Sequence, residues 1–138
     1  MEDIERETAV CGKMDRQELM NYIFDVYGVE PDYPFPDDGV SCVFRHADNR
    51  KWFALAMNIR RERLGLAGAG SVDILNVKCD PLLIGALRGK PGFLPAYHMN
   101  KDKWMTALLD GTAGREEIEM LLAVSYELTA SRKRRAGR

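Results

Sequence analysis

The grouping of strand-like segments in the middle of the chain most limits how it can fold. Residues 41–46, 51–57 and 72–78 are rich in β-branched and aromatic side chains, and a further strand is expected around residues 103–109. Amphipathic helices are predicted before this group, from residue 15 to about 28, and after it, from about residue 112. Grouped strands with terminal helices favour an α+β fold, in which an antiparallel meander packs against the N- and C-terminal helices.

Capping residues set the predicted helix boundaries. Asp15 can cap the first helix, with Glu18 three residues later as in a capping box, and Gly28 can end it. Asp80 followed by Pro81 predicts a short helix between the strands. In the last helix, the spacing of five residues predicts one buried stripe: Ile118, Leu121, Leu122, Ser125 and Leu128.

Three connections are predicted between these elements. Three prolines between residues 31 and 36 forbid a helix or a central strand there, and Tyr33 and Phe35 are expected to pin this extended segment to the body. Asp48-Asn49 predicts a hairpin turn. Residues 58–71 combine arginines with glycines and are predicted to be a mobile, basic hairpin connection, whereas residues 92–99 are expected to form a loop.

The length of 138 residues suits one domain. We predict a flexible extension at residues 1–14, a single domain at 15–131 and a basic tail at 132–138. The three cysteines are widely spaced and form no disulfide framework, and neither a signal peptide nor a membrane span is visible. A soluble, cytoplasmic protein is therefore expected, with Cys42 and Cys79 as buried thiols.

Charge is divided unevenly along the chain. Residues 1–48 carry twelve acids and four bases, a balance of −8, whereas residues 49–138 carry nine acids and sixteen bases, a balance of +7. Such a division is compatible with a polar interaction surface, and equally with chance segregation of solvated charges.

Two basic segments are candidates for contacting nucleic acid. Arg60, Arg61 and Arg63 precede a glycine-rich stretch, as in a loop that settles along a phosphate backbone. A second segment gathers His98, Asn100, Lys101 and Lys103 beside Trp104. The alternatives are a solvated loop at the arginines, and a structural role for Trp104 and the polar residues before it.

Nothing in the sequence indicates catalysis. The only histidines are His46 and His98, no His/Cys/Asp set has metal-binding spacing, and Cys79 is better explained as a buried thiol than as a nucleophile paired with His98. The glycines at 65–70 lead into a strand rather than a helix, which is the wrong context for a phosphate loop. An anion site near Lys78 is disfavoured because Asp80 caps the helix that follows. No enzyme activity, cofactor or metal is predicted.

Several short motifs, in order along the chain, resemble the MmcQ/YjbR family of small bacterial proteins. They are residues 33–35 (Tyr-Pro-Phe), 51–54 (Lys-Trp-Phe-Ala), 76–81 (Asn-Val-Lys-Cys-Asp-Pro), 95–101 (Pro-Ala-Tyr-His-Met-Asn-Lys) and 125–128 (Ser-Tyr-Glu-Leu), with Trp104 and Asp110-Gly111. The resemblance implies a frataxin-like (CyaY-like) fold of helices around a sheet, and the double-wing DNA binding proposed for the family.

Three hypotheses follow for function. The first is DNA binding without catalysis, through the seven basic and polar residues at 60–63 and 98–103. The second is a protein-interaction module that uses the acidic first helix with Tyr33 and Phe35. The third is weak iron binding on the acids around that helix, such as Asp15, Glu18 and Asp25. The sequence indicates neither a target sequence nor an oligomeric state.

Overall fold

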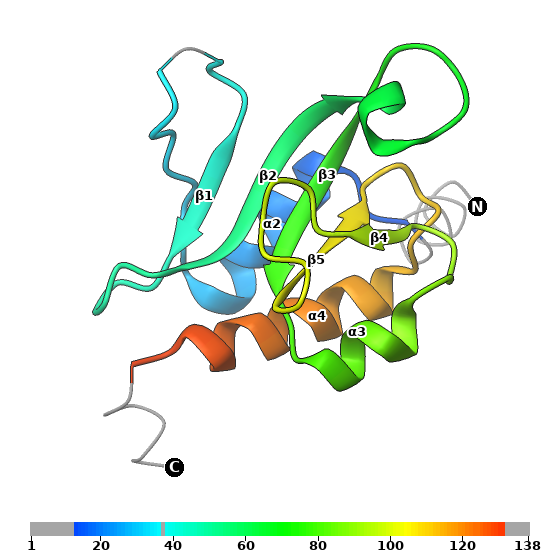
Figure 1. The fold of residues 1–138 in the computed structure, drawn as a ribbon. Coiled ribbons are helices and arrows are strands. Elements are labelled where there is room, and N and C mark those ends of the chain that lie inside the picture. The colour runs from blue at the N-terminus through cyan, green and yellow to red at the C-terminus, as the bar shows by residue number, and fades with distance from the viewer. Residues whose placement is uncertain (1–12, 37, 132–138) are drawn as a thin grey trace, which may run out of the picture.

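Five antiparallel strands form one open sheet at the centre of the protein, which confirms the predicted α+β class (Figure 1). In this computed structural model, residues 13–36 and 38–131 are described, so the predictions for residues 1–12 and 132–138 lie outside the described residues. The strands are β1 (Cys42–Arg45), β2 (Trp52–Arg60), β3 (Ser71–Lys78), β4 (Phe93–Pro95) and β5 (Trp104–Leu108). Their spatial order is β1-β2-β3-β5-β4.

Within residues 13–36 and 38–131, three helices pack on one face of this sheet. They are α2 (Arg16–Tyr27), α3 (Pro81–Leu87) and α4 (Arg115–Thr129), and their apolar side chains join one core with the sheet. The capping box of Asp15 and Glu18 is confirmed, as is the left-handed Gly28 that ends α2. In α4 the predicted stripe is buried except for Leu128, which is half-buried, while Thr129 is buried beside it.

Strand alternation gives the sheet a second apolar face, away from the helices. Leu75 and Val77 of β3 pack toward the helices, whereas Val72 and Ile74 form a smaller cluster with Leu108 on the opposite side. This second face is covered by Leu64 and Leu66 of the β2–β3 connection, by Leu94 of β4 and by Tyr97 of the loop that follows it. In Figure 1 the yellow 96–103 loop crosses the sheet on the viewer's side, while α2 lies behind it.

A buried polar cluster holds the 96–98 loop against the sheet. Asn76 and Thr106 lie opposite each other on β3 and β5, and both are fully buried. The Thr106 hydroxyl donates to Asn76 Oδ1 and accepts from the Tyr97 amide at 2.9 Å, while Asn76 Nδ2 donates to the Tyr97 carbonyl at 3.3 Å. Because buried amide groups are costly unless they are paired, these bonds fix where the loop lies.

Ser125 of α4 bridges β2 and β3 where their pairing stops. The last register pair is Ala54 with Val77. Beyond it the Ser125 hydroxyl donates to the Phe53 carbonyl at 2.6 Å and accepts from the Lys78 amide at 2.9 Å. The two strands therefore separate around a helix side chain at this end of the sheet.

The structure corrects several local predictions. The expected loop at 92–99 contains β4, and β2 continues past its predicted end at Met57 to Arg60, before a 3₁₀ turn, η1 (Arg61–Leu64). The predicted hairpin connection between β2 and β3 is confirmed, because the two strands pair antiparallel. The hairpin predicted at Asp48-Asn49 is confirmed, because β1 and β2 pair antiparallel on either side of it, and its left-handed residue is Arg50, with φ of 63°.

Two further predictions about how segments attach to the body also change. Phe35 meets Trp52 edge to face at 6.0 Å, as expected, but Tyr33 remains 49% exposed and does not pin its segment. Met14, assigned to the extension, is buried in the core, so the folded domain begins before residue 15.

Candidate nucleic-acid interface

Three of the seven predicted contact residues line one hollow on the sheet face opposite the helices. Arg63 comes from η1, and His98 and Lys101 from the loop after β4. The hollow has a volume of about 340 Å³, and its other walls are Leu64, Leu94, Pro95, Ala96 and Tyr97. No acidic side chain lines it. We call it the loop hollow.

The loop that carries His98 is held in an unusual backbone conformation. His98 is exposed, has a left-handed φ of 58°, and stacks on Tyr97 with ring centroids 4.1 Å apart. Lys101 donates to the Ala96 carbonyl at 2.9 Å, which closes the loop on itself. A non-glycine residue in this conformation is uncommon, and such strain is typical of binding loops.

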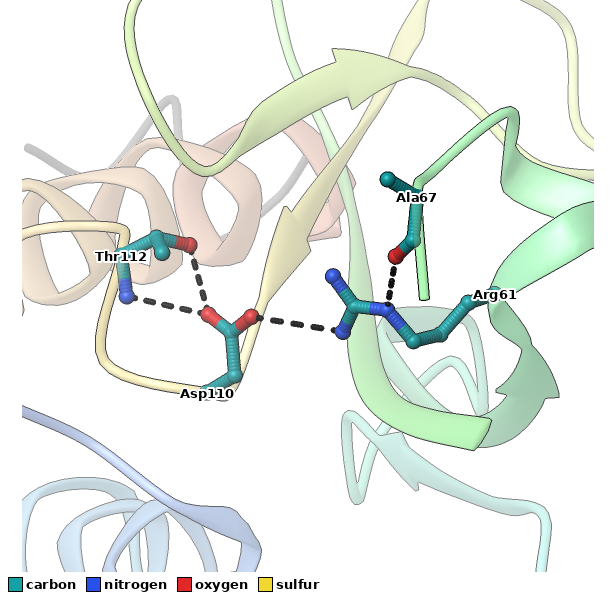
Figure 2. A network of polar contacts seen from close by, with 4 residues as sticks. All are labelled: Arg61, Ala67, Asp110 and Thr112. Carbon is teal, nitrogen blue, oxygen red and sulfur yellow. Dashed lines mark hydrogen bonds and ion pairs between the residues drawn. The ribbon is translucent and has the colours of Figure 1, made fainter. Parts of the chain in front are cut away.

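Arg61 has a structural partner on each side (Figure 2). Its Nε donates to the Ala67 carbonyl at 2.7 Å, and a terminal nitrogen lies 3.9 Å from Asp110 Oδ2. Asp110 in turn accepts from the Thr112 amide at 3.0 Å, at the turn before α4. Arg61 therefore ties the glycine-rich 65–70 loop to the β5–α4 turn, and its guanidinium is less available to a ligand.

The remaining predicted residues lie outside the loop hollow. Arg60 is exposed and paired with Glu62 at 3.1 Å. Asn100 Oδ1 accepts from the Asp102 amide at 2.8 Å, which shapes the turn before β5. Lys103 is exposed, and its carbonyl accepts from the Cys79 amide at 2.8 Å.

A second hollow, which the sequence reading missed, lies at the end of the sheet where Ser125 separates β2 from β3. It has a volume of about 380 Å³ and is lined by Arg50, Lys51, Trp52, Lys78, Trp104 and Thr129. We call it the tryptophan hollow. The sequence indicated part of this hollow. Lys51 precedes Trp52, and Lys78 and Trp104 occupy the facing ends of two predicted strands. The lining residues are far apart in the sequence, so the sequence alone did not predict that they come together.

Cys42 and Cys79, the two cysteines among the described residues, are both buried with free thiols. Burial, followed by the charge of Asp80, raises the pKa of the Cys79 thiol to about 11, so it stays protonated at neutral pH. Burial also raises the pKa of Cys42. His46 is buried and hydrogen-bonded to Thr129 at 2.8 Å, while His98 is exposed in the loop hollow.

The structure offers no metal-binding cluster in the part of the chain that it describes: no three His, Cys, Asp or Glu side chains come together there. Asp15 and Glu18, named for iron binding, bond to each other's backbone in the capping box. Asp80 accepts from the Leu83 amide at 2.9 Å, as expected of a cap that occupies the helix start near Lys78. None of the helices within residues 13–36 and 38–131 has the length and apolarity needed to span a bilayer.

The protein is a small α+β domain built around one antiparallel sheet, and it carries two basic hollows. The YjbR family model matches residues 24–128, and the chain belongs to that family, which confirms the resemblance seen in its motifs. It is 39% identical over 116 residues to the uncharacterised protein YyaQ of Bacillus subtilis strain 168, which covers 84% of this chain and 98% of that protein.

Solved structures share the fold. A crystal structure of a protein from Pseudomonas syringae has a TM-score of 0.82 and 45% identity, and the match covers 85% of this chain and all (100%) of that one. A Deinococcus radiodurans protein with a DUF419 domain has a TM-score of 0.63 and 25% identity, over 87% of this chain and 81% of that one.

Proposed function

We propose that this protein binds DNA without catalysis, by contacting the phosphate backbone at the loop hollow. The observation that carries the proposal is the convergence of Arg63, His98 and Lys101, from two connections far apart in sequence, on a hollow with no acidic wall. Among the described residues, no acidic side chain forms an ion pair with Arg63 or Lys101. Asn100 and Lys103 would extend the contact surface around it, whereas Arg60 is occupied by its ion pair with Glu62.

Phosphate binding suits this geometry for two reasons. Lysine and arginine side chains displace the counterions of DNA when they bind, which supplies affinity that depends on salt. The His98 ring, stacked on Tyr97 and exposed, offers a hydrogen-bond donor beside them. The free buried thiols Cys42 and Cys79 suit a reducing compartment, and we propose the cytoplasm as the site of action.

The test is fluorescence anisotropy of a labelled short DNA duplex titrated with protein at several salt concentrations. The slope of log affinity against log salt should be negative, and the double variant R63Q/K101Q should make it shallower by about 1.8, because each lost phosphate contact removes about 0.9. The single variant R63Q is measured beside a matched control, Arg60→Gln. The control removes the same charge next to the same turn, but from a side chain that is already paired with Glu62.

Two results would count against the proposal. Binding that is absent even at low salt would remove nucleic acid as the ligand. Equal losses in R60Q and R63Q would mean that only net charge matters and that the loop hollow is not the contact site.

A second candidate function rests on exposed apolar side chains. Phe24 and Val26 of α2 and Tyr33 of the proline-rich segment are 51%, 53% and 49% exposed. Exposed aromatic side chains favour contact with a protein partner. A pull-down that returns one stoichiometric partner with the wild type but not with Y33S/F24S would favour this function, and recovery of nucleic acid alone would disfavour it.

A further inference from the structure

The tryptophan hollow combines the aromatic and cationic groups that recognise a nucleotide. The chain has two tryptophans, and both line this hollow. Three cationic side chains share it: Arg50 and Lys51 from the hairpin, and Lys78 from the end of β3. Its volume of about 380 Å³ lies within the range of roughly 300–1,000 Å³ that is typical of small-molecule sites.

Strand ends and α4 supply four of the lining residues, and the β1–β2 turn supplies Arg50 and Lys51. Trp104 lies opposite Lys78 in the β3–β5 pairing, and Thr129 belongs to α4. Ser125 keeps β2 and β3 apart at this end through its bonds to the Phe53 carbonyl and the Lys78 amide. The opening between Trp52 and Lys78 is therefore a consequence of backbone pairing that α4 interrupts.

The charges in this hollow are not balanced locally. In the described part of the chain, no ion pair involves Arg50, Lys51 or Lys78, and no acidic side chain is among the lining residues. Trp52 is in addition approached by Arg45, whose guanidinium carbon lies 5.7 Å from the ring centroid. Three cations around aromatic rings, without carboxylates, favour an anion that carries a planar group.

We propose that the tryptophan hollow binds one nucleotide unit, with its base against a tryptophan and its phosphate on the cations. Base stacking on aromatic side chains tolerates any base, and lysine and arginine hold the phosphate by charge-assisted hydrogen bonds. The unit comes either from a free nucleotide or from an unpaired position in a single strand. This site uses none of the loop-hollow residues, so it does not depend on duplex binding there.

Intrinsic tryptophan fluorescence reports directly on this site, because both emitting side chains line it. The full-length protein is titrated with deoxyadenosine monophosphate, with a short oligodeoxyadenylate, and with two half-ligands, deoxyadenosine and inorganic phosphate. We expect saturable quenching by at least one of the first two, with affinity about tenfold or more above either half-ligand, since only the complete unit uses both halves of the site. Quenching by the mononucleotide points to a free ligand, and quenching by the oligomer alone points to a strand.

The test variant is K51Q/K78Q, which keeps both tryptophans. It should weaken nucleotide binding by about tenfold or more, because two charged partners of the phosphate are lost. The matched control is K13Q/K90Q, which removes two lysine charges that lie in neither hollow and should leave quenching unchanged. A Trp104→Leu variant, followed through Trp52, should lose affinity for deoxyadenosine but not for inorganic phosphate, and thermal melting checks that each variant folds.

Three outcomes would overturn the proposal. They are no quenching by any probe, equal affinity for inorganic phosphate and the complete nucleotide, and equal loss in K51Q/K78Q and K13Q/K90Q. Each can occur with duplex binding intact at Arg63 and Lys101, so failure here is distinguishable from failure of the proposed function.

Discussion

The two hollows differ in what builds them. The loop hollow takes its cations from η1 and from the connection after β4, and buried bonds of Asn76 and Thr106 hold that connection in place. The tryptophan hollow takes its groups from strand ends, the β1–β2 turn and α4. The loop hollow is thus positioned by a few hydrogen bonds, whereas the tryptophan hollow is positioned by the strands, the β1–β2 turn and α4.

This difference implies that the two hollows respond differently to substitution. Substitutions that release β4 and the loop after it should impair the loop hollow. They should leave ligand binding in the tryptophan hollow intact, provided that the sheet stays folded. Substitutions that perturb that connection test whether the two hollows are independent. Within η1, separate substitutions of Arg61 and Arg63 distinguish an arginine with internal partners from one that faces the loop hollow.

The largest effect is expected at Gly92, which leads into β4. Its φ is 88°, and an added Cβ would lie 2.3 Å from the Ala113 amide nitrogen. Gly92→Ala should lower the free energy of unfolding by about 4 kcal/mol, since backbone strain adds to overpacking. The matched control is Gly89→Ala, at φ of 86° with open space around the Cβ, which should cost only about 1–2 kcal/mol. Urea unfolding measures both, and equal losses would contradict the clash.

The next effect is expected at Asn76, beneath the loop hollow. Asn76→Ala leaves the Tyr97 carbonyl and the Thr106 hydroxyl without their partner, which should cost about 3 kcal/mol and weaken duplex binding. Tryptophan quenching by nucleotide should persist below the melting temperature. Asn58→Ala on the adjacent strand, which removes an exposed bond to Asp73, should change stability by only about 0.5 kcal/mol. If N76A abolished both kinds of binding equally, the two hollows would not be independent.

Much of the frame was predictable because its signals are local. Capping residues, strand alternation and proline spacing predicted three helices and four of the strands, and β4 was missed because only three residues between a turn and a loop form it. The loop hollow was partly predictable because its cations cluster along the chain. The tryptophan hollow was not, because Lys51, Lys78 and Trp104 meet only through strand pairing and Ser125.

A third effect concerns the aromatic side chains that pack between α2 and α4. Tyr27 stacks on Tyr126 at 4.5 Å, next to Ser125, and burial raises the pKa of Tyr27 to about 12. Because the folded state holds this phenol proton more tightly than the unfolded state, stability is complete below pH 10 and falls as the pH rises toward 12. Relative to the wild type, Tyr27→Phe should lose about 2 kcal/mol less over that interval. The measurement is the free energy of unfolding of both proteins across that pH interval. Equal losses of stability in the wild type and in Tyr27→Phe would contradict the prediction.

The smallest effect, and the sharpest comparison, lies within one turn. Arg61→Gln removes the bond to Ala67 and the ion pair with Asp110, so it should lower stability by about 1 kcal/mol (Figure 2). Arg63→Gln loses no such bond and should leave stability unchanged, while duplex affinity falls about fivefold.

These two arginines carry the same charge two positions apart, so net charge cannot separate them. Any difference in thermal melting must come from the Ala67 and Asp110 contacts, and any difference in anisotropy from access to the loop hollow. A larger loss of affinity in R61Q than in R63Q at matched folded fraction would reverse the assignment. The bound phosphate would then lie at the glycine-rich loop, and Arg61 would exchange its internal partners for the ligand.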